Sequence, residues 1–252
     1  MLFHFVLRSP CTIFAQKNIY MSNLLSNWLL FMLFFLPAVS FAQEEYPSAE
    51  PTMTIIANDG SETEDVSFDG SAPMHARFQS HPTNVGNYYP FCEWRFIKEG
   101  EEKPFLIRYD EDTEYTFQES GSFSVELYIS FVQGSDTIEF VMEEPYRINI
   151  SESKFELPNA FTPNGDGIND IFKVKEGYES IVSFEAKVFN RWGKKLYEWS
   201  DLEGGWDGKS GGTEVPDGAY YLIVKARGAD GKKYDTKKVI NILRGYTEKS
   251  SE

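Results

Sequence analysis

A strict alternation of apolar and polar residues is the feature that most limits how this chain folds. Every second residue of 122–129 is apolar, beginning with Phe123 and ending with Ile129, and the same pattern recurs in 137–142 and 146–150. A period of two residues is the period of a β-strand, whose successive side chains point to opposite faces. We therefore expect each strand to place one face on a core and the other in solvent, as antiparallel sandwiches require.

Turn signals separate these strands at short intervals, and each contains a glycine. No stretch after residue 42 shows helical periodicity long enough for a core helix. Short strands at regular spacing are typical of β-sandwiches. The fold class predicted is all-β, with two consecutive immunoglobulin-like antiparallel β-sandwiches after a signal peptide. The turn signals are Asp59-Gly60, Asp69-Gly70, Glu99-Gly100, Ser120-Gly121 and Gly134-Ser135.

The first 42 residues are predicted to be a signal peptide. Residues 24–36 are a short apolar run, and the small residues Ser40 and Ala42 suit cleavage before residue 43. The run is shorter than the ~20 apolar residues that span a bilayer, so we expect no transmembrane anchor. Met21 is the more natural start, which would make residues 1–20 an artefact. The expected location is the cell surface or the medium, reached through the periplasm.

Charge divides the remainder of the chain into two halves. Residues 43–152 carry 23 Asp and Glu against 6 Lys and Arg, a net charge of −17, whereas residues 153–252 carry 16 of each sign. Such acidity excludes nucleic acid as a partner, because the chain would repel phosphates. We take 43–152 and 153–252 as the two domains. The acidic half is interpreted as a solubility feature, and a divalent cation or a basic partner is the alternative.

Two motifs of the second half resemble a known family. Residues 157–172 read Leu-Pro-Asn-Ala-Phe-Thr-Pro-Asn-Gly-Asp-Gly-Ile-Asn-Asp-Ile-Phe, and residues 189–193 read Phe-Asn-Arg-Trp-Gly. With the Trp-Asp-Gly of 206–208 and the Pro-Asp-Gly-Ala-Tyr-Tyr of 216–221, they resemble the gliding-motility-associated C-terminal domain of Bacteroidota. This is the type B sorting domain of the type IX secretion system, and the resemblance covers about 155–244.

The resemblance implies export through the type IX secretion apparatus, with its outer-membrane components as partners. Arg and Trp are enriched at binding hot spots, so Arg191 and Trp192 could serve recognition. The preferred interpretation is nevertheless that Trp192 and Trp206 fill the core, with Arg191 stacked on Trp192. The residues expected to serve either recognition or domain integrity are Pro158, Asn159, Phe161, Pro163, Asn190, Arg191, Trp192 and Gly193.

The loop at 164–170 is the one candidate cofactor site. Asn164, Asp166, Asn169 and Asp170 bring oxygen-bearing side chains within seven residues, and Ca²⁺ prefers six to eight oxygen ligands. The alternative, which we prefer, is a tight turn closed by Asx hydrogen bonds, with its glycines at positive φ. No other cofactor is predicted.

The first half resembles PKD-like (polycystic-kidney-disease-type) domains at 72–78, 93–96 and 115–127. Arg95 stands where that family has an Asp, and residues 97–100 replace its Gly-Asp-Gly turn. The fold expectation survives this departure, because Trp94 and Phe96 can still supply the core. PKD-like domains act mostly as spacers and interaction modules on surface proteins, which the resemblance implies here.

Motifs of catalysis are missing from the sequence, so the protein is predicted not to be an enzyme. The carboxylates Asp110, Glu111, Asp112 and Glu114 are interpreted as a solvated surface, with a hydrolase as the weaker reading. Cys92 remains alone after the signal peptide, so no internal disulfide is expected, and we predict that it is buried.

An adhesin is the second function considered. In that hypothesis Tyr88, Tyr89 and Phe91 form an exposed platform for a surface glycan or protein, and the chain stays in the periplasm or envelope. The C-terminal domain would then be a structural module.

Overall fold

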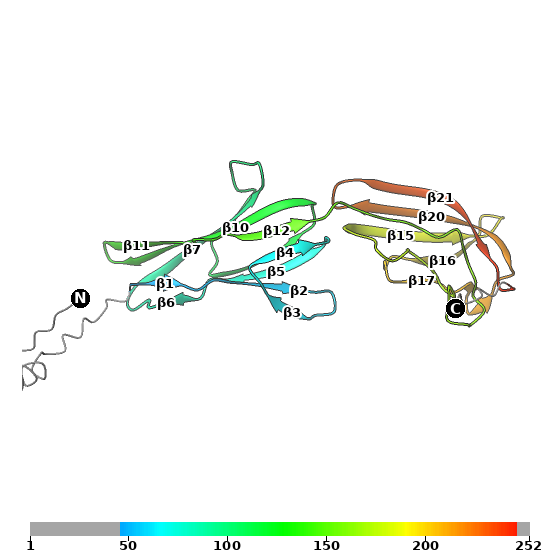
Figure 1. Ribbon diagram of the computed structural model, residues 1–252, viewed down its shortest axis with the longest axis horizontal. Helices are drawn as coiled ribbons and strands as arrows, with labels where there is room; N and C mark the ends of the chain where they lie inside the picture. Colours follow the sequence, from blue (N-terminus) through cyan, green and yellow to red (C-terminus); the bar gives the residue numbers. More distant parts are fainter. Residues whose placement is uncertain (1–45, 246–252) are drawn as a thin grey trace, which may run out of the picture. The chain divides into compact units, whose positions relative to one another are not determined.

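The computed structural model describes residues 46–245, and every regular element in this range is a β-strand (Figure 1). The predicted all-β class with immunoglobulin-like sandwiches is confirmed. The described residues contain no helix that is long and apolar enough to cross a membrane. The predicted signal peptide at 1–42 lies outside the described residues.

The first sandwich packs two sheets face to face. One sheet has the order β4-β12-β10-β7-β8, with β11 also paired to β10, and the other has the order β3-β2-β5-β9. A two-stranded ribbon, β1 with β6, accompanies them. The strands are β1 Ser48–Ala49, β2 Thr52–Ile56, β3 Glu62–Glu64, β4 Ser67–Gly70, β5 Met74–Gln79, β6 Pro82–Thr83, β7 Tyr89–Lys98, β8 Leu106–Arg108, β9 Asp112–Phe117, β10 Gly121–Gln133, β11 Asp136–Val141 and β12 Tyr146–Ile150.

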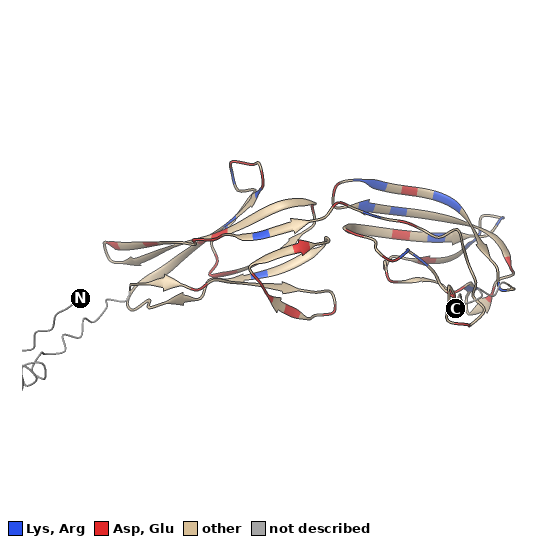
Figure 2. Ribbon diagram, viewed as in Figure 1, with Lys and Arg blue, Asp and Glu red and all other residues tan. Residues whose placement is uncertain are grey.

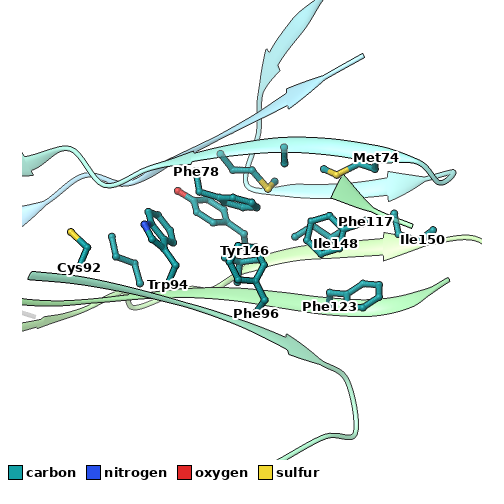
Figure 3. Close-up of a cluster of buried hydrophobic side chains, with 14 of the residues drawn as sticks. Met74, Phe78, Cys92, Trp94, Phe96, Phe117, Phe123, Tyr146, Ile148 and Ile150 are labelled. Carbon is teal, nitrogen blue, oxygen red and sulfur yellow. The ribbon is translucent and has the colours of Figure 1, made fainter. Parts of the chain in front are cut away.

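The core of this sandwich is the apolar side of the alternation. Along β10 the residues from Phe123 to Ile129 at every second position are buried, as predicted. Trp94 and Phe96 of β7 are fully buried, and Phe78 of β5 contacts Phe96 edge to face with ring centroids 5.4 Å apart. Figure 3 shows these rings gathered between the two sheets. Edge-to-face contacts of this kind are favourable beyond the area they bury.

The expected turn at Asp69-Gly70 is wrong. Both residues belong to β4, which pairs with β12 in parallel, and Asn149 donates a 2.7 Å hydrogen bond to Asp69 Oδ1. A Cβ at position 70 would lie 2.5 Å from the ring of Phe68. Gly70 therefore provides space for a neighbouring ring at the last position of a strand, and the chain bends only at residues 72–73.

The second sandwich is built on one five-stranded sheet with the order β13-β21-β20-β15-β16. Two ribbons, β14 with β17 and β18 with β19, complete it. Most pairs are antiparallel, but β13 runs parallel to β21. The strands are β13 Ala160–Phe161, β14 Phe172–Lys173, β15 Ile181–Phe189, β16 Lys195–Trp199, β17 Gly205–Trp206, β18 Lys209–Ser210, β19 Thr213–Glu214, β20 Gly218–Gly228 and β21 Lys233–Ile242.

Basic residues gather on two long strands of this sheet. Figure 2 shows Lys and Arg on β20 and β21, where Arg227 lies opposite Lys233 and Lys225 lies opposite Asp235. Positions 225 and 227 of β20 are exposed and alternate with the buried Val224 and Ala226. The outer face of these two strands thus carries more basic than acidic residues, although this half of the chain is neutral in total.

Candidate functional site

The hairpin between β15 and β16 has a tightly closed tip. Asn190 Oδ1 accepts hydrogen bonds from the backbone N–H of Trp192 (3.0 Å) and of Lys194 (2.9 Å). The Asn190 N–H donates to the Lys194 carbonyl, and the Gly193 N–H donates to the Asn190 carbonyl. Gly193 has φ of 80°, a conformation that glycine adopts without steric cost. Asn190 and Gly193 thus fix the backbone on which the tip residues stand.

Trp192 stands exposed on this tip, so the predicted core position of Trp192 is wrong. Its side chain is 76% exposed, and the Arg191 guanidinium lies 4.3 Å from its ring centroid. The predicted stacking of Arg191 on Trp192 is therefore present, but at the surface. The physical reason is that residues 190–194 form a closed turn between β15 and β16, which presents Trp192 to solvent instead of placing it on the inward face of a strand.

Trp206 occupies the core position, as predicted. It is fully buried, and its ring centroid lies 5.5 Å from that of Phe161 and 5.3 Å from that of Tyr220. Its indole N–H donates a 2.7 Å hydrogen bond to the Lys209 carbonyl. A buried indole needs such a partner, and the turn after β17 supplies it.

A groove runs beside the hairpin tip. Leu196 of β16 and the half-exposed Tyr221 of β20 line it together with the segment 215–219. Tyr220 fixes that segment by donating a 2.6 Å hydrogen bond to the Pro216 carbonyl. Apolar walls and an exposed indole at the rim are typical of a surface that contacts another protein.

Arg244 is the residue that our sequence reasoning missed. Its Nη1 donates to the Val215 carbonyl (2.7 Å) and to Asp217 Oδ1 (2.8 Å), and its Nη2 donates to the Gly208 carbonyl (3.2 Å). Its backbone N–H also donates to Asp217 Oδ2. Arg244 thereby ties the groove wall to the end of β21. Asp217 of the Pro-Asp-Gly turn could have indicated it, because a carboxylate in a turn is often paired with a basic side chain.

The segment 158–163 is held chiefly by the last strand. Phe161 is buried against Phe172 and Trp206, and its carbonyl accepts a hydrogen bond from the Leu243 N–H. Of its neighbours, Pro158 and Pro163 are partly buried, whereas Asn159 is exposed and accepts from the Asn241 N–H through its carbonyl. Phe161 is therefore part of the core and does not line the groove.

The loop 164–170 is closed by its own side chains. Asp170 accepts backbone hydrogen bonds from Gly165 (2.7 Å) and Gly167 (2.8 Å), one on each carboxylate oxygen. Asp166 Oδ1 accepts from the Ile168 N–H, and Asn164 Oδ1 accepts from the Asp166 N–H. These bonds are those of the Asx-turn interpretation.

The same loop was the candidate calcium site. Gly165, Gly167 and Asn169 have positive φ, and the Gly165 N–H, followed by that of Gly167, lowers the pKa of Asp170. Within residues 46–245, no three His, Cys, Asp or Glu side chains are grouped so as to hold a metal ion. Calcium binding by Asn164, Asp166, Asn169 and Asp170 stays a prediction.

In the first sandwich, residues of the acidic run at 110–114 form hydrogen bonds and an ion pair at the surface. Asp112 accepts from the Ser80 N–H and from Gln79, and Glu114 pairs with Arg77 at 2.8 Å. The hydrogen bond from Arg77 lowers the pKa of Glu114.

Cys92 is buried as predicted, and burial raises the pKa of its thiol, which disfavours the reactive thiolate.

The three residues of the predicted platform do not lie on one surface: Tyr89 and Phe91 lie on the outer face of β7, whereas Tyr88 packs against the core. Tyr89 and Phe91 are 73% and 62% exposed and share the outer face of the strand. Tyr88 precedes the strand, packs against the core and donates a hydrogen bond to Asp136 Oδ2.

Comparison with known families decides the nature of the second sandwich. The family described as CHU_C type IX secretion signal domain matches residues 155–242. Residues 155–242 are a type IX secretion signal domain. The resemblance recognised in the sequence is thus confirmed, and the signal domain contains the hairpin tip, the groove and the loop 164–170. A signal of this type directs export to the cell surface or the medium, and the signal domain is itself a non-enzymatic module.

Other comparisons add little. No curated protein matches the chain. Among solved structures, it is similar to the Bacteroides ovatus mixed-linkage glucan utilization locus SGBP-B in complex with a mixed-linkage heptasaccharide, at 9% identity and a TM-score of 0.23, covering 70% of this chain and 42% of that one. It is also similar to a tetra-tandem repeat in the extending region of a large adhesion protein, at 9% identity and a TM-score of 0.28, covering 79% and 68%. These likenesses carry no functional argument.

Proposed function

We propose that this is a non-catalytic secreted or cell-surface protein, exported through the type IX secretion system by its second sandwich. The match of residues 155–242 to the type IX secretion signal domain is the observation that carries the proposal. The first sandwich is the passenger, a PKD-like spacer or adhesive module. Its buried Trp94 and Phe96 support a structural role for the motif that resembles the PKD signature.

Within the signal domain, we assign contact with the outer-membrane components of the apparatus to the hairpin tip and its groove. Trp192 is exposed, yet Asn190 holds the backbone beneath it with two hydrogen bonds. A large aromatic side chain presented on a fixed backbone loses little entropy when it binds. Phe161 serves the integrity of the domain, because it is buried in the core.

Localisation in the native host tests the proposal. The full chain and a chain that ends at residue 152 are compared by protease shaving and fractionation. We expect the full chain at the surface or in the medium and the truncated chain in the periplasm. Unchanged localisation on truncation would instead favour the structural-module alternative, in which the protein is an adhesin of the periplasm or envelope.

A point variant tests the recognition surface separately. Trp192→Ala is expected to fold normally, because only the exposed indole is lost. The variant should nevertheless be retained in the periplasm, because the proposed contact with the secretion apparatus is lost with the indole. Tyr109→Ala is the matched control, since Tyr109 is an equally exposed aromatic residue of the first sandwich. Normal export of Trp192→Ala would refute the role of the hairpin tip without affecting the role of the domain.

A further inference from the structure

The outer face of β7, β10 and β11 carries a row of aromatic and apolar side chains that are exposed or half-buried. Tyr89 lies opposite Val132 and Phe91 lies opposite Ser130 on β10, and Tyr128 of β10 lies opposite Val141 of β11. Tyr89, Phe91 and Val141 are more than half exposed. We name this surface the aromatic face and define it by Tyr89, Phe91, Tyr128, Val132 and Val141.

Polar side chains are interleaved with these rings and held in place. The Arg95 guanidinium lies 3.8 Å from the Tyr128 ring centroid, and its Nε donates a 2.6 Å hydrogen bond to Glu93. The Tyr128 hydroxyl donates to Glu126 Oε2 at 2.9 Å. These groups come from adjacent strands and therefore share one side of the sheet.

A third carboxylate completes this polar set. Ser130 Oγ donates a 2.8 Å hydrogen bond to Glu139 Oε2, across the pair of β10 and β11. Each of the three carboxylates, those of Glu93, Glu126 and Glu139, uses one oxygen in these hydrogen bonds. The second oxygen of each can accept a hydrogen bond from a ligand.

We propose that the aromatic face binds a neutral polysaccharide chain. Sugar rings present C–H faces that pack on aromatic rings, and their hydroxyls donate to carboxylates. Tyr89 and Phe91 are two residues apart on one strand, so their side chains repeat every ~7 Å along it. A flat face with such a repeat suits an extended chain better than an enclosed small molecule. This inference concerns the first sandwich and does not rest on the export role.

Charge on the face decides between this ligand and others. Three glutamates, Glu93, Glu126 and Glu139, stand against Arg95 and, on the neighbouring strand β12, Arg147. With the net charge of −17 on this half of the chain, anionic polysaccharides and anionic lipid surfaces would be repelled. A two-fold pairing of the face with a second copy would bring together two faces that both carry an excess of glutamates, which is unfavourable. A neutral ligand rich in hydroxyl groups is not repelled by the glutamates and can donate hydrogen bonds to them.

Affinity electrophoresis of the purified full-length secreted protein tests the inference. Native gels contain hydroxyethylcellulose, galactomannan, mannan or dextran as neutral probes, and alginate as the acidic one. We expect retardation by at least one neutral polysaccharide and none by alginate. Tyr89→Ala and Phe91→Ala should each weaken the binding about tenfold, as the loss of one stacking ring predicts.

Controls separate binding from folding. Tyr109→Ala removes an exposed aromatic residue outside the face and should leave retardation unchanged. Phe91→Trp keeps a stacking ring and should retain binding, and the melting temperatures of all variants should match that of the wild type. The inference is overturned if no neutral probe retards the protein, if alginate retards it more strongly, or if the folded alanine variants bind as the wild type does.

Discussion

At the scale of single residues, the signal domain uses tryptophan in two opposite ways. Trp206 is enclosed by Phe161 and Tyr220, whereas Trp192 projects from a turn with Arg191 against its ring. Both follow short polar or glycine-containing segments, so local sequence does not distinguish them. The difference arises from the turn that Asn190 closes, which is a matter of backbone geometry.

These environments predict different costs of truncation. Trp206→Ala should lower the free energy of unfolding by about 3–5 kcal/mol, because it leaves a cavity among buried rings. Trp192→Ala should change it by less than about 0.5 kcal/mol, as surface substitutions usually do. Urea unfolding followed by far-ultraviolet circular dichroism measures both values. A large loss for Trp192→Ala would mean that its stacking with Arg191 is structural.

Asp170 should make the stability of the signal domain depend on pH. Backbone hydrogen bonds, first from Gly165, lower its pKa below its ordinary value of 3.8 in the folded state. The folded carboxyl therefore binds its proton less tightly than the unfolded one, so its contribution is present above pH ~4 and is lost as the pH falls through the folded pKa.

Asp170→Asn tests this dependence. An asparagine offers one acceptor oxygen, so its amide group would face the N–H of Gly165 or of Gly167. We expect the variant to melt below the wild type near neutral pH, and the two melting temperatures to converge as the pH falls below ~4. A gap that stays constant down to pH ~2 would contradict the assignment to the ionised carboxylate.

At the scale of strands, alternation predicted the elements well and their partners poorly. The strands around 122–129 and 146–150 lie where expected, with Phe123 and Ile148 inward. Alternation says nothing about which strand lies alongside, so the parallel pairs of β4 with β12 and of β13 with β21 were not foreseen. Partner choice depends on contacts distant in sequence, which a local pattern does not contain.

Close packing within the ribbon of β14 and β17 gives a prediction for Gly205 of β17. A Cβ on Gly205 would lie 2.5 Å from Ile171 Cγ2 and 2.7 Å from the Phe172 carbonyl oxygen. Gly205→Ala should therefore force β14 and β17 apart and lower the free energy of unfolding by about 1–3 kcal/mol. Gly245→Ala, at a position with no neighbour within 4 Å, is the matched control. Equal denaturation midpoints for the two variants would contradict this account.

A candidate site could be predicted from the sequence when the residues that form it are neighbours in the sequence, and could not when they come from distant segments. The loop 164–170 is closed by residues within it, and its Asx turns could be proposed from Asn164, Asp166 and Asp170 alone. The groove requires β16, β20 and Arg244 to meet, over a separation in sequence that no motif spans. The sequence therefore indicated the hairpin tip but not the wall beside it.

At the scale of the whole molecule, the two halves differ in charge as they do in proposed role. The passenger half carries a net charge of −17, while the half with the signal domain is neutral, with 16 residues of each sign. A strongly acidic passenger stays soluble and avoids anionic surfaces. The aromatic face interrupts that surface with exposed rings, which is why we assign it a ligand.

The parallel pair of β13 and β21 has a consequence for the order of events in a cell. Ribosomes deliver a chain from its N-terminus, so Phe161 is made some eighty residues before Leu243. The Leu243 N–H donates the hydrogen bond that the Phe161 carbonyl accepts. Until then the segment at 158–163 lacks the strand that holds it. A chain whose synthesis stops before β21 therefore lacks the strand that pairs with β13, and the sheet of its signal domain stays incomplete.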